Sequence, residues 1–335
     1  MKLIIVKENE ANQRLDKFLA KYMDKAPKNF FYKMLRKKNI TLNKRKADGS
    51  ERLQTGDEIS LFLSEETIES FTSPRGHTAV KRNSFLPKPE ILYEDAHILL
   101  FNKPVGLLSQ KARPEDVSLV EFLRDYLLDS GQITTEELRS FRPGICSRLD
   151  RNTSGLVVAG KTLAGLQAMN ELIRAHRLCK RYRCIAAGTI PGSGRAEGWL
   201  VKDDQANQVR IYQKEQKGSQ YICMLYTPLE QLSIDGMVCT YLEIQLITGR
   251  SHQIRAHFAS MGYPLLGDPK YGDPCKNQYV RRQFGLTHQL LHAFCLEFPK
   301  IQGGLEPLSN QKFTAPLPEL FAKILDAGRR DLRPL

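Results

Sequence analysis

The chain has 335 residues, of which 41% are hydrophobic and 26% charged, a balance typical of a folded protein rather than a disordered one. This length favours one large domain and one small one. Lysine and arginine outnumber aspartate and glutamate by 50 to 37, which gives a formal net charge of +13. Such an excess favours a polyanionic partner, because lysines and arginines that bind phosphates release condensed counterions.

The sequence indicates neither secretion nor insertion in a membrane. Its seven cysteines form no CxxC pair and are odd in number, which is typical of reduced thiols. The apolar run at residues 3–6 ends at Lys7 and is too short for a signal peptide. No stretch approaches the roughly 18 apolar residues of a membrane helix. We therefore expect a cytoplasmic protein without a membrane partner.

Residues 1–64 are predicted to form a small α/β domain. Apolar residues recur at helical spacing after Asn12, a residue suited to cap a helix, and a second helix is expected near Pro27. Alternation of apolar residues at 40–42 and 59–63 predicts two strands, with a turn at Gly56-Asp57 before the second.

Basic residues dominate the segment from Lys28 to Lys46, which has no acidic residue. The aromatic residues Phe30, Phe31 and Tyr32 are interleaved with them. A solvated helix face is one interpretation, but the run crosses a helix, a strand and a turn, which favours a phosphate-binding surface. The basic residues are Lys28, Lys33, Arg36, Lys37, Lys38, Lys44, Arg45 and Lys46.

Four short segments of this domain carry a resemblance to a known RNA-binding domain. They are QRLDKFL at 13–19, YKMLRK at 32–37, ITLN at 40–43 and GD at 56–57. Together they resemble the S-four-like domain, named after ribosomal small-subunit protein four. The resemblance implies that residues 1–64 bind RNA.

Residues 65–88 are rich in Ser, Thr, Pro, Gly and basic residues, which predicts a linker. From residue 89 to 328, strand-like segments outnumber helical ones and do not alternate with them. The strands are expected at 98–101, 156–159, 182–187, 209–212 and 241–246, and the helices at 118–128 and 163–177. This order predicts an α+β domain with a mixed, largely antiparallel sheet.

Residues 155–162, GLVVAGKT, satisfy the phosphate-loop pattern GxxxxGK[ST]. That loop works because its intervening residues turn and present N–H groups to phosphates. Here four consecutive apolar residues stand in that place and predict a strand. We therefore interpret Lys161 and Thr162 as the start of the next helix, with Thr162 as its cap.

Just upstream, RLDRNTSG at 148–155 predicts a tight polar loop before a buried strand. Taken alone, the loop fits an Asx turn with a surface ion pair. Three further segments, one before this loop and two after it, match a known family in the right order. They are YED at 93–95 leading to NKPVGL at 102–107, KRYRCIAAG at 180–188, and LITGRSHQIRAH at 246–257 followed by GYP at 262–264 and GDPKYG at 267–272. Together they resemble the pseudouridine synthases of large-subunit ribosomal RNA, the RluA-type family, in the branch with an N-terminal S-four-like domain and closest to the RluC and RluD types. Ser147 departs from the family, many members of which have histidine there.

The resemblance implies a catalytic role for three residues. Asp150 matches the family nucleophile, Arg255 the arginine that pairs with it, and Tyr182 the tyrosine that stacks on the target base. Arg148 matches the residue that fills the space left in the RNA by the flipped nucleotide. From the sequence, we expect Ser251 to cap a helix that carries Arg255 at the border of its apolar face; a structural ion pair is the alternative interpretation of this arginine.

The conversion of uridine to pseudouridine, which the resemblance implies, involves no redox change and needs no phosphate hydrolysis, so we expect no cofactor. His252 and His257 are five residues apart rather than four, which argues against a helical zinc site. The expected partner is RNA, either large-subunit ribosomal RNA or a pre-ribosomal particle, with the enzyme acting as a monomer. Three alternatives stay open: a synthase of transfer RNA, a non-catalytic protein of ribosome assembly, and a phosphate-loop NTPase.

Overall fold

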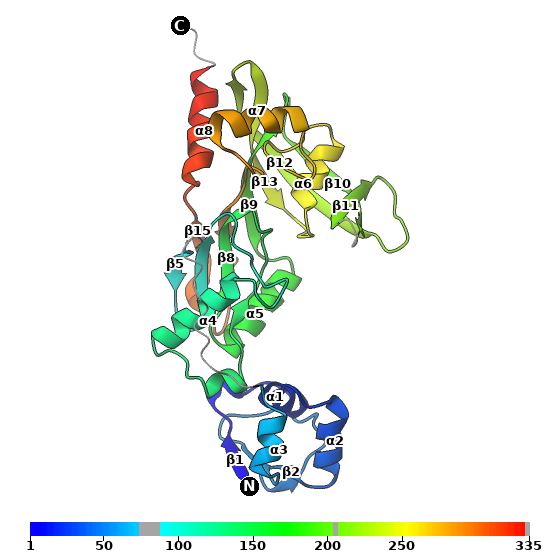
Figure 1. Cartoon of the computed structure of the whole chain (residues 1–335), viewed down its shortest axis with the longest axis vertical. Coiled ribbons are helices and arrows are strands. Elements are labelled where there is room, and N and C mark those ends of the chain that lie inside the picture. Colours follow the sequence, from blue (N-terminus) through cyan, green and yellow to red (C-terminus); the bar gives the residue numbers. More distant parts are fainter. Residues whose placement is uncertain (74–87, 204–206, 332–335) are drawn as a thin grey trace.

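The computed structural model describes residues 1–73, 88–203 and 207–331, and the elements lie along an extended body (Figure 1). The first 73 residues form one end. The helices α4 (Leu119–Asp129) and α5 (Leu163–Arg174) lie near the middle with β8 (Ser154–Gly160). The helices α6 (Gln253–Ser260), α7 (Pro274–Phe284) and α8 (Glu319–Arg330) lie at the other end with the strands β10 to β13, which fall within residues 194–246 (Figure 1). No helix within these ranges has the length and hydropathy to span a bilayer.

The N-terminal module has one antiparallel sheet in the order β1-β4-β2-β3 and a core of its own. Its strands are β1 (Lys2–Ile5), β2 (Ile40–Leu42), β3 (Arg45–Lys46) and β4 (Glu58–Leu61), and its helices are α1 (Leu15–Tyr22), α2 (Lys28–Arg36) and α3 (Glu65–Ser70). The elements α1, α2, β2 and β4 agree with the helices and strands that the sequence predicts for residues 1–64, whereas β1 and β3 are not among the predicted strands.

Two helix starts differ from the prediction. Asn12 does not cap α1: it has a positive φ of 61°, and α1 begins at Leu15. Backbone carbonyls of residues 49–51 accept the N–H groups of Leu15 and Asp16, so the helix start needs no side-chain cap. Pro27 precedes α2 as its N-cap instead of lying in the first turn.

The expectation of a linker at residues 65–88 is wrong for residues 65–70, which form α3. Ser64 accepts a hydrogen bond from the backbone of Thr67, and Ile68 is buried in the core of the module. Phe71 packs on Phe30 with the ring centroids 4.6 Å apart. A cap and two apolar anchors therefore order this segment despite its polar composition. Residues 74–87 of the predicted linker lie outside the described residues.

The large sheet follows the order β11-β10-β12-β13-β9-β14-β8-β6-β5, with β15 beside β14 and β7 beside β8. Its pairs are antiparallel except β8 with β14, so the predicted mixed and largely antiparallel α+β fold is confirmed. The strands are β5 (Glu90–Glu94), β6 (Ile98–Lys103), β7 (Gly144–Ile145), β8 (Ser154–Gly160), β9 (Cys179–Ala187), β10 (Gly194–Asp203), β11 (Gln208–Tyr212), β12 (Gln220–Ile234), β13 (Met237–Leu246), β14 (Leu291–Glu297) and β15 (Lys312–Thr314). The helices are α4 (Leu119–Asp129), α5 (Leu163–Arg174), α6 (Gln253–Ser260), α7 (Pro274–Phe284) and α8 (Glu319–Arg330).

The segment with the phosphate-loop pattern is a fully buried strand, β8. Lys161 donates to Glu94 at 2.5 Å and to the carbonyl of Asp95 at 2.8 Å. Thr162 caps α5, as expected, by accepting the N–H of Gly165. These residues therefore join β8, β5 and α5 instead of forming a phosphate cradle.

Gly155 allows the parallel pairing of β8 with β14. It has a φ of 108°, and a Cβ at this position would lie 2.2 Å from the carbonyl oxygen of Ala293 on β14. The parallel pairing extends over two residue pairs, Ser154 with His292 and Gly155 with Ala293. The polar loop at 148–153 is thereby fixed at the point where β8 meets β14.

Polar contacts join the N-terminal module to the rest of the chain. Lys7 lies 3.1 Å from Glu137, and Arg142 donates to Asp24 at 2.9 Å. Ser140 donates to Glu10, and both of these side chains are buried. The N-terminal module, which carries the basic segment, therefore contacts the connection between α4 and β7 of the large domain.

Candidate active site

The polar loop, residues 148–153, is held by the segment that follows β6. Ser109 bonds Leu149 twice, accepting its N–H at 3.0 Å and donating to its carbonyl at 2.8 Å. The carbonyl of Arg151 accepts the N–H of Gly106 at 3.0 Å. Backbone contacts on both sides of Asp150 thus fix its position, so its side chain projects from a rigid support.

Lys103 also joins the loop at 148–153 to the segment that follows β6. Its buried ammonium donates to three carbonyls, those of Pro104, Leu107 and Arg151, at 2.8–3.0 Å. Burial lowers the pKa of Lys103 to about 7, and the charge of Asp150 opposes that shift. Each N–H of the ammonium has an acceptor, so the lysine is a cross-link between the two segments.

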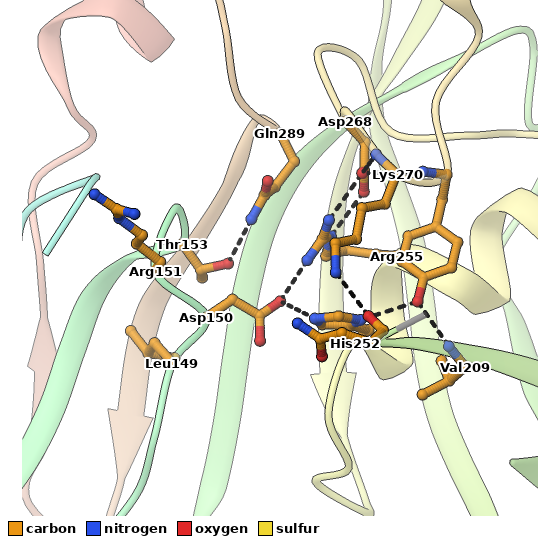
Figure 2. Close-up of polar contacts among 12 residues, drawn as sticks. Leu149, Asp150, Arg151, Thr153, Val209, His252, Arg255, Asp268, Lys270 and Gln289 are labelled. Carbon is orange, nitrogen blue, oxygen red and sulfur yellow. Dashed lines mark hydrogen bonds and ion pairs between the residues drawn. The ribbon is translucent and has the colours of Figure 1, made fainter. Parts of the chain in front are cut away.

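Asp150 forms an ion pair with Arg255, as the resemblance implies. Figure 2 shows Arg255 between Asp150 and Asp268, and one of its Nη atoms donates to Asp150 Oδ2 at 2.8 Å. The side chain of Asp150 is 26% exposed and that of Arg255 only 5%. Among the described residues, Asp150 Oδ1 has no partner, so one carboxylate oxygen is available to a ligand.

Asp268 holds the far side of the guanidinium. Arg255 donates to both of its oxygens, at 2.7 and 2.9 Å, and the backbone N–H groups of Lys270 and Tyr271 also donate to it. Burial alone would raise the pKa of the Asp268 carboxyl, but these bonds and the charge of Arg255 outweigh it and lower the pKa. Two carboxylates therefore share one arginine, and the group carries a net negative charge.

Helix α6, which carries Arg255, does not begin as predicted. Ser251 is not its cap: His252 precedes the helix with a positive φ of 55°. The side chain of Gln253 instead accepts the N–H of Arg250 at 3.1 Å and donates to the carbonyl of Cys223. This buried glutamine ties the start of α6 to β12 and so sets the direction of Arg255.

His252 lies beside the ion pair (Figure 2), and Tyr271 contacts both His252 and Arg255. His252 Nδ1 lies 2.9 Å from the hydroxyl of Tyr271, and its Nε2 lies 3.9 Å from Asp150 Oδ2. Burial is the main cause that lowers the pKa of His252, and Arg255 and Lys270 add to it, while Asp150 opposes it. The guanidinium of Arg255 lies 5.3 Å from the centroid of the Tyr271 ring.

A cavity of about 870 Å³ opens in front of Asp150, which is its one acidic lining residue among those described. Tyr182, Arg148 and Arg255 also line it, so the structure brings together the four residues that the resemblance selects in the large domain. Burial, and then the charge of Asp150, raise the pKa of Tyr182. Nine lysines and arginines line the cavity: Lys111, Arg148, Arg151, Lys180, Arg181, Lys202, Arg250, Arg255 and Lys270.

The basic residues of the N-terminal module do not line this cavity. The eight basic residues of the segment from Lys28 to Lys46 are all exposed, and they lie on α2, directly after it and around β3. Of the three interleaved aromatics, Phe31 is buried and Phe30 packs against the core, which leaves Tyr32 on the surface. The module therefore presents a second basic surface with fewer exposed aromatic rings than the sequence indicated.

No role is predicted from the sequence for Asp268, Lys103 or Gln289, which support the site. Gln289 donates to Thr153 at 3.1 Å and lines the cavity. Asp268 and Lys103 lie within segments that carry the family resemblance, and that was the available signal. No comparable signal marks Gln289. In the described parts of the chain, no three histidine, cysteine, aspartate or glutamate side chains are grouped to hold a metal ion.

Comparisons with known proteins identify relatives of this chain. A family model described as RNA pseudouridylate synthase matches residues 97–260. An uncharacterized RNA pseudouridine synthase of Mycoplasma genitalium is 31% identical over 92% of each chain. The ribosomal large subunit pseudouridine synthase C of Escherichia coli K12 is 28% identical over 89% of this chain and 88% of its own. The human protein called RNA pseudouridylate synthase domain containing 4 has a similar fold, with a TM-score of 0.53 and 23% identity over 71% of this chain and 92% of its own.

Proposed function

This chain belongs to the RNA pseudouridine synthase family, and we propose that it converts uridines of large-subunit ribosomal RNA to pseudouridine with Asp150 as the nucleophile. The names of full-length relatives, such as the Escherichia coli enzyme, support the choice of RNA. The substrate uridine would leave its stack and enter the cavity in front of Asp150, at a cost of roughly a few kcal/mol.

The reaction exchanges one glycosidic bond for another. The bond from uracil N1 to ribose C1′ breaks, the base turns, and uracil C5 bonds to C1′. The proton on C5 goes to solvent and N1 gains one, so the product is an isomer of the substrate. Asp150 would form a transient covalent bond with the nucleotide and leave as a carboxylate, which is nucleophilic catalysis.

The ion pair of Asp150 with Arg255 is the observation that carries this proposal. A carboxylate that is partly withdrawn from solvent is costly without a cationic partner. Arg255 supplies that partner, but Asp268 shares its charge, so Asp150 keeps nucleophilic character. The free Oδ1 atom would be the attacking oxygen.

Tyr182 and Arg148 are proposed to position the RNA. Burial and the charge of Asp150 raise the pKa of Tyr182, so its phenol stays neutral, the ring can stack on the uracil, and the hydroxyl can donate a hydrogen bond. Arg148 is exposed at the rim of the cavity, from which its planar cation would fill the space that the flipped nucleotide leaves.

The N-terminal module is proposed as a second contact with the same RNA. Its exposed cations, Lys28, Lys33, Arg36, Lys37, Lys38, Lys44 and Arg45, suit phosphates on a flank distant from the target uridine. Lys44 lies 3.7 Å from Glu58, so its contribution competes with an exposed ion pair.

RNA labelled with tritium at uracil C5 tests the proposal, because the rearrangement must release that label. The wild-type protein should release tritium from large-subunit ribosomal RNA, and Asp150→Asn should release none while still binding RNA. Asp326→Asn, an exposed change on α8, is the matched control. Release from transfer RNA alone would overturn the choice of substrate, and release by Asp150→Asn would overturn the assignment of the nucleophile.

A further inference from the structure

Lys180, two residues before Tyr182 on β9, is a cation without a partner in the described parts of the chain. Its neighbours across β13 and β14 are Leu246 and Leu296. Burial lowers the pKa of its ammonium, and no charged group contributes to that shift. Among the described residues, Lys180 makes no hydrogen bond or ion pair.

An unpaired ammonium among leucines is costly for the folded state. Lys161 and Lys103, which are similarly withdrawn from solvent, have a carboxylate or three carbonyls as partners. Lys180 instead lines the cavity in front of Asp150, so its missing partner has to come from outside the protein.

A second hollow of about 270 Å³ adjoins that cavity at Lys180. The two share Lys180 and Arg250 as lining residues, and Arg174 and His176 line the far side of the second hollow. No acidic side chain is among its lining residues within the described chain. The surface therefore continues as a cationic path from Asp150 past Lys180 to the end of α5.

We propose that Lys180 binds a backbone phosphate of the substrate RNA next to the target uridine, and that the flanking strand continues into the hollow between Arg174 and Arg250. This inference rests on the proposed function. Lys180 and Tyr182 are two residues apart on one strand, so their side chains share a face roughly 7 Å apart. That distance is comparable with one nucleotide of an extended RNA backbone, so a base on Tyr182 brings its neighbouring phosphate to Lys180.

Lys180→Met tests this inference, because methionine keeps the apolar stem and removes the charge. For tritium release, we expect KM for RNA to rise roughly 5- to 10-fold while kcat at saturating RNA stays within about twofold. In an Asp150→Asn background, the slope of log K against log salt for a single-stranded oligoribonucleotide should become shallower by about 0.7–0.9, the loss of one phosphate contact. Lys180→Arg should restore both values.

A purely structural role would give the opposite result for stability. Since no described residue pairs with Lys180, Lys180→Met should unfold at the same or a higher urea concentration than the wild type. Lys323→Met, at an exposed position on α8, is the control. Unchanged KM and salt slope in Lys180→Met, or lower stability that Lys180→Arg does not restore, would overturn the inference. A wild-type protein that binds RNA with the predicted dependence on Lys180 but releases no tritium would refute only the proposed function.

Discussion

Arg255 and Asp268 form a bidentate ion pair, in which Nε and one Nη of the guanidinium donate to the two carboxylate oxygens at 2.7 and 2.9 Å. The side chain of Asp268 has no exposed surface. This pair fixes the plane of the guanidinium, so the remaining Nη points at Asp150 (Figure 2). Asp268 is therefore a positioning residue that acts on Asp150 through Arg255.

Asp268→Asn should separate this positioning from the nucleophile itself. Asparagine offers one acceptor in place of two and removes the buried carboxylate, so Asp150 alone is left to balance the charge of Arg255. Breaking a buried pair costs about 3–5 kcal/mol of unfolding free energy, and misplacing Arg255 should lower kcat roughly 100-fold. Urea unfolding and tritium release at saturating RNA measure the two effects. A variant that is destabilised but keeps the wild-type kcat would contradict the positioning role.

Arg255→Lys should be a poor replacement although it keeps the charge. The lysine ammonium is a point charge and cannot reproduce the planar fork that bonds Asp268 twice and Asp150 once. A hydrogen bond to a charged group contributes about 1.5–3 kcal/mol, so the loss of one should lower the unfolding free energy by about 2 kcal/mol. Tritium release should fall in kcat. Wild-type kcat and stability in this variant would show that charge alone suffices.

Much of this site could be predicted because its residues lie in contiguous segments. The loop around Asp150, the strand of Tyr182 and the helix of Arg255 each carry a local pattern, and the structure brings them to one cavity. The fold class followed from the order of strands and helices. Thr162 as a cap and residues 156–159 as a strand followed from turn chemistry and apolar runs.

The remainder depends on contacts between distant segments, which a local pattern does not contain. The start of α1 uses carbonyls of residues 49–51, and that of α6 uses Gln253, so the predicted caps Asn12 and Ser251 have no such role. Residues 65–70 form a helix because Ile68 enters the core of the module. Lys180 has a charge whose isolation becomes visible only when its neighbours on β13 and β14 are known.

Replacing Lys33, Arg36 and Lys37 together by glutamine tests the N-terminal surface. All three are exposed, so the unfolding free energy should change little. If each contacts a phosphate, the slope of log K against log salt should fall by about 2 or somewhat more, and KM should rise while kcat is kept. The measurement is RNA binding at several salt concentrations. An unchanged slope would assign these residues to a solvated face, and Lys323→Gln is the control for loss of a cation elsewhere.

Gly155→Ala should be among the most damaging single changes in the chain. Its Cβ would lie 2.2 Å from the carbonyl oxygen of Ala293, and its φ of 108° is one that alanine rarely adopts. A clash with backbone on β14 cannot be relieved by a rotamer change, so we expect a loss of more than about 4 kcal/mol. Gly192→Ala, where a Cβ meets nothing within 4 Å, is the control. Urea unfolding of both variants measures the loss of unfolding free energy. A loss in Gly155→Ala as small as in the control would mean that β8 and β14 can separate.

His292 should make the stability of the chain depend on pH below neutrality. It is fully buried on β14, with Nδ1 2.9 Å from the hydroxyl of Ser154 and Nε2 3.2 Å from the carbonyl of Ala315. Nε2 must donate to that carbonyl, so in the neutral ring Nδ1 accepts from the hydroxyl of Ser154. Burial lowers the pKa of His292 to about 4, and the bond to Ala315 opposes the shift.

The sign of the effect follows from which state binds the proton. Between the ordinary histidine pKa of about 6.5 and the lower pKa of the folded state, His292 is protonated in the unfolded chain and neutral in the folded chain. Its contribution to stability is therefore full above this pH window and is lost as pH falls through it. The loss is about 1.4 kcal/mol per pH unit. His292→Gln lacks this titration, so its deficit in unfolding free energy relative to the wild type should shrink by about 2 kcal/mol from about pH 6.5 to about pH 5. Urea unfolding at both pH values measures the deficit, and a constant deficit would show that His292 titrates alike in the folded and unfolded chains.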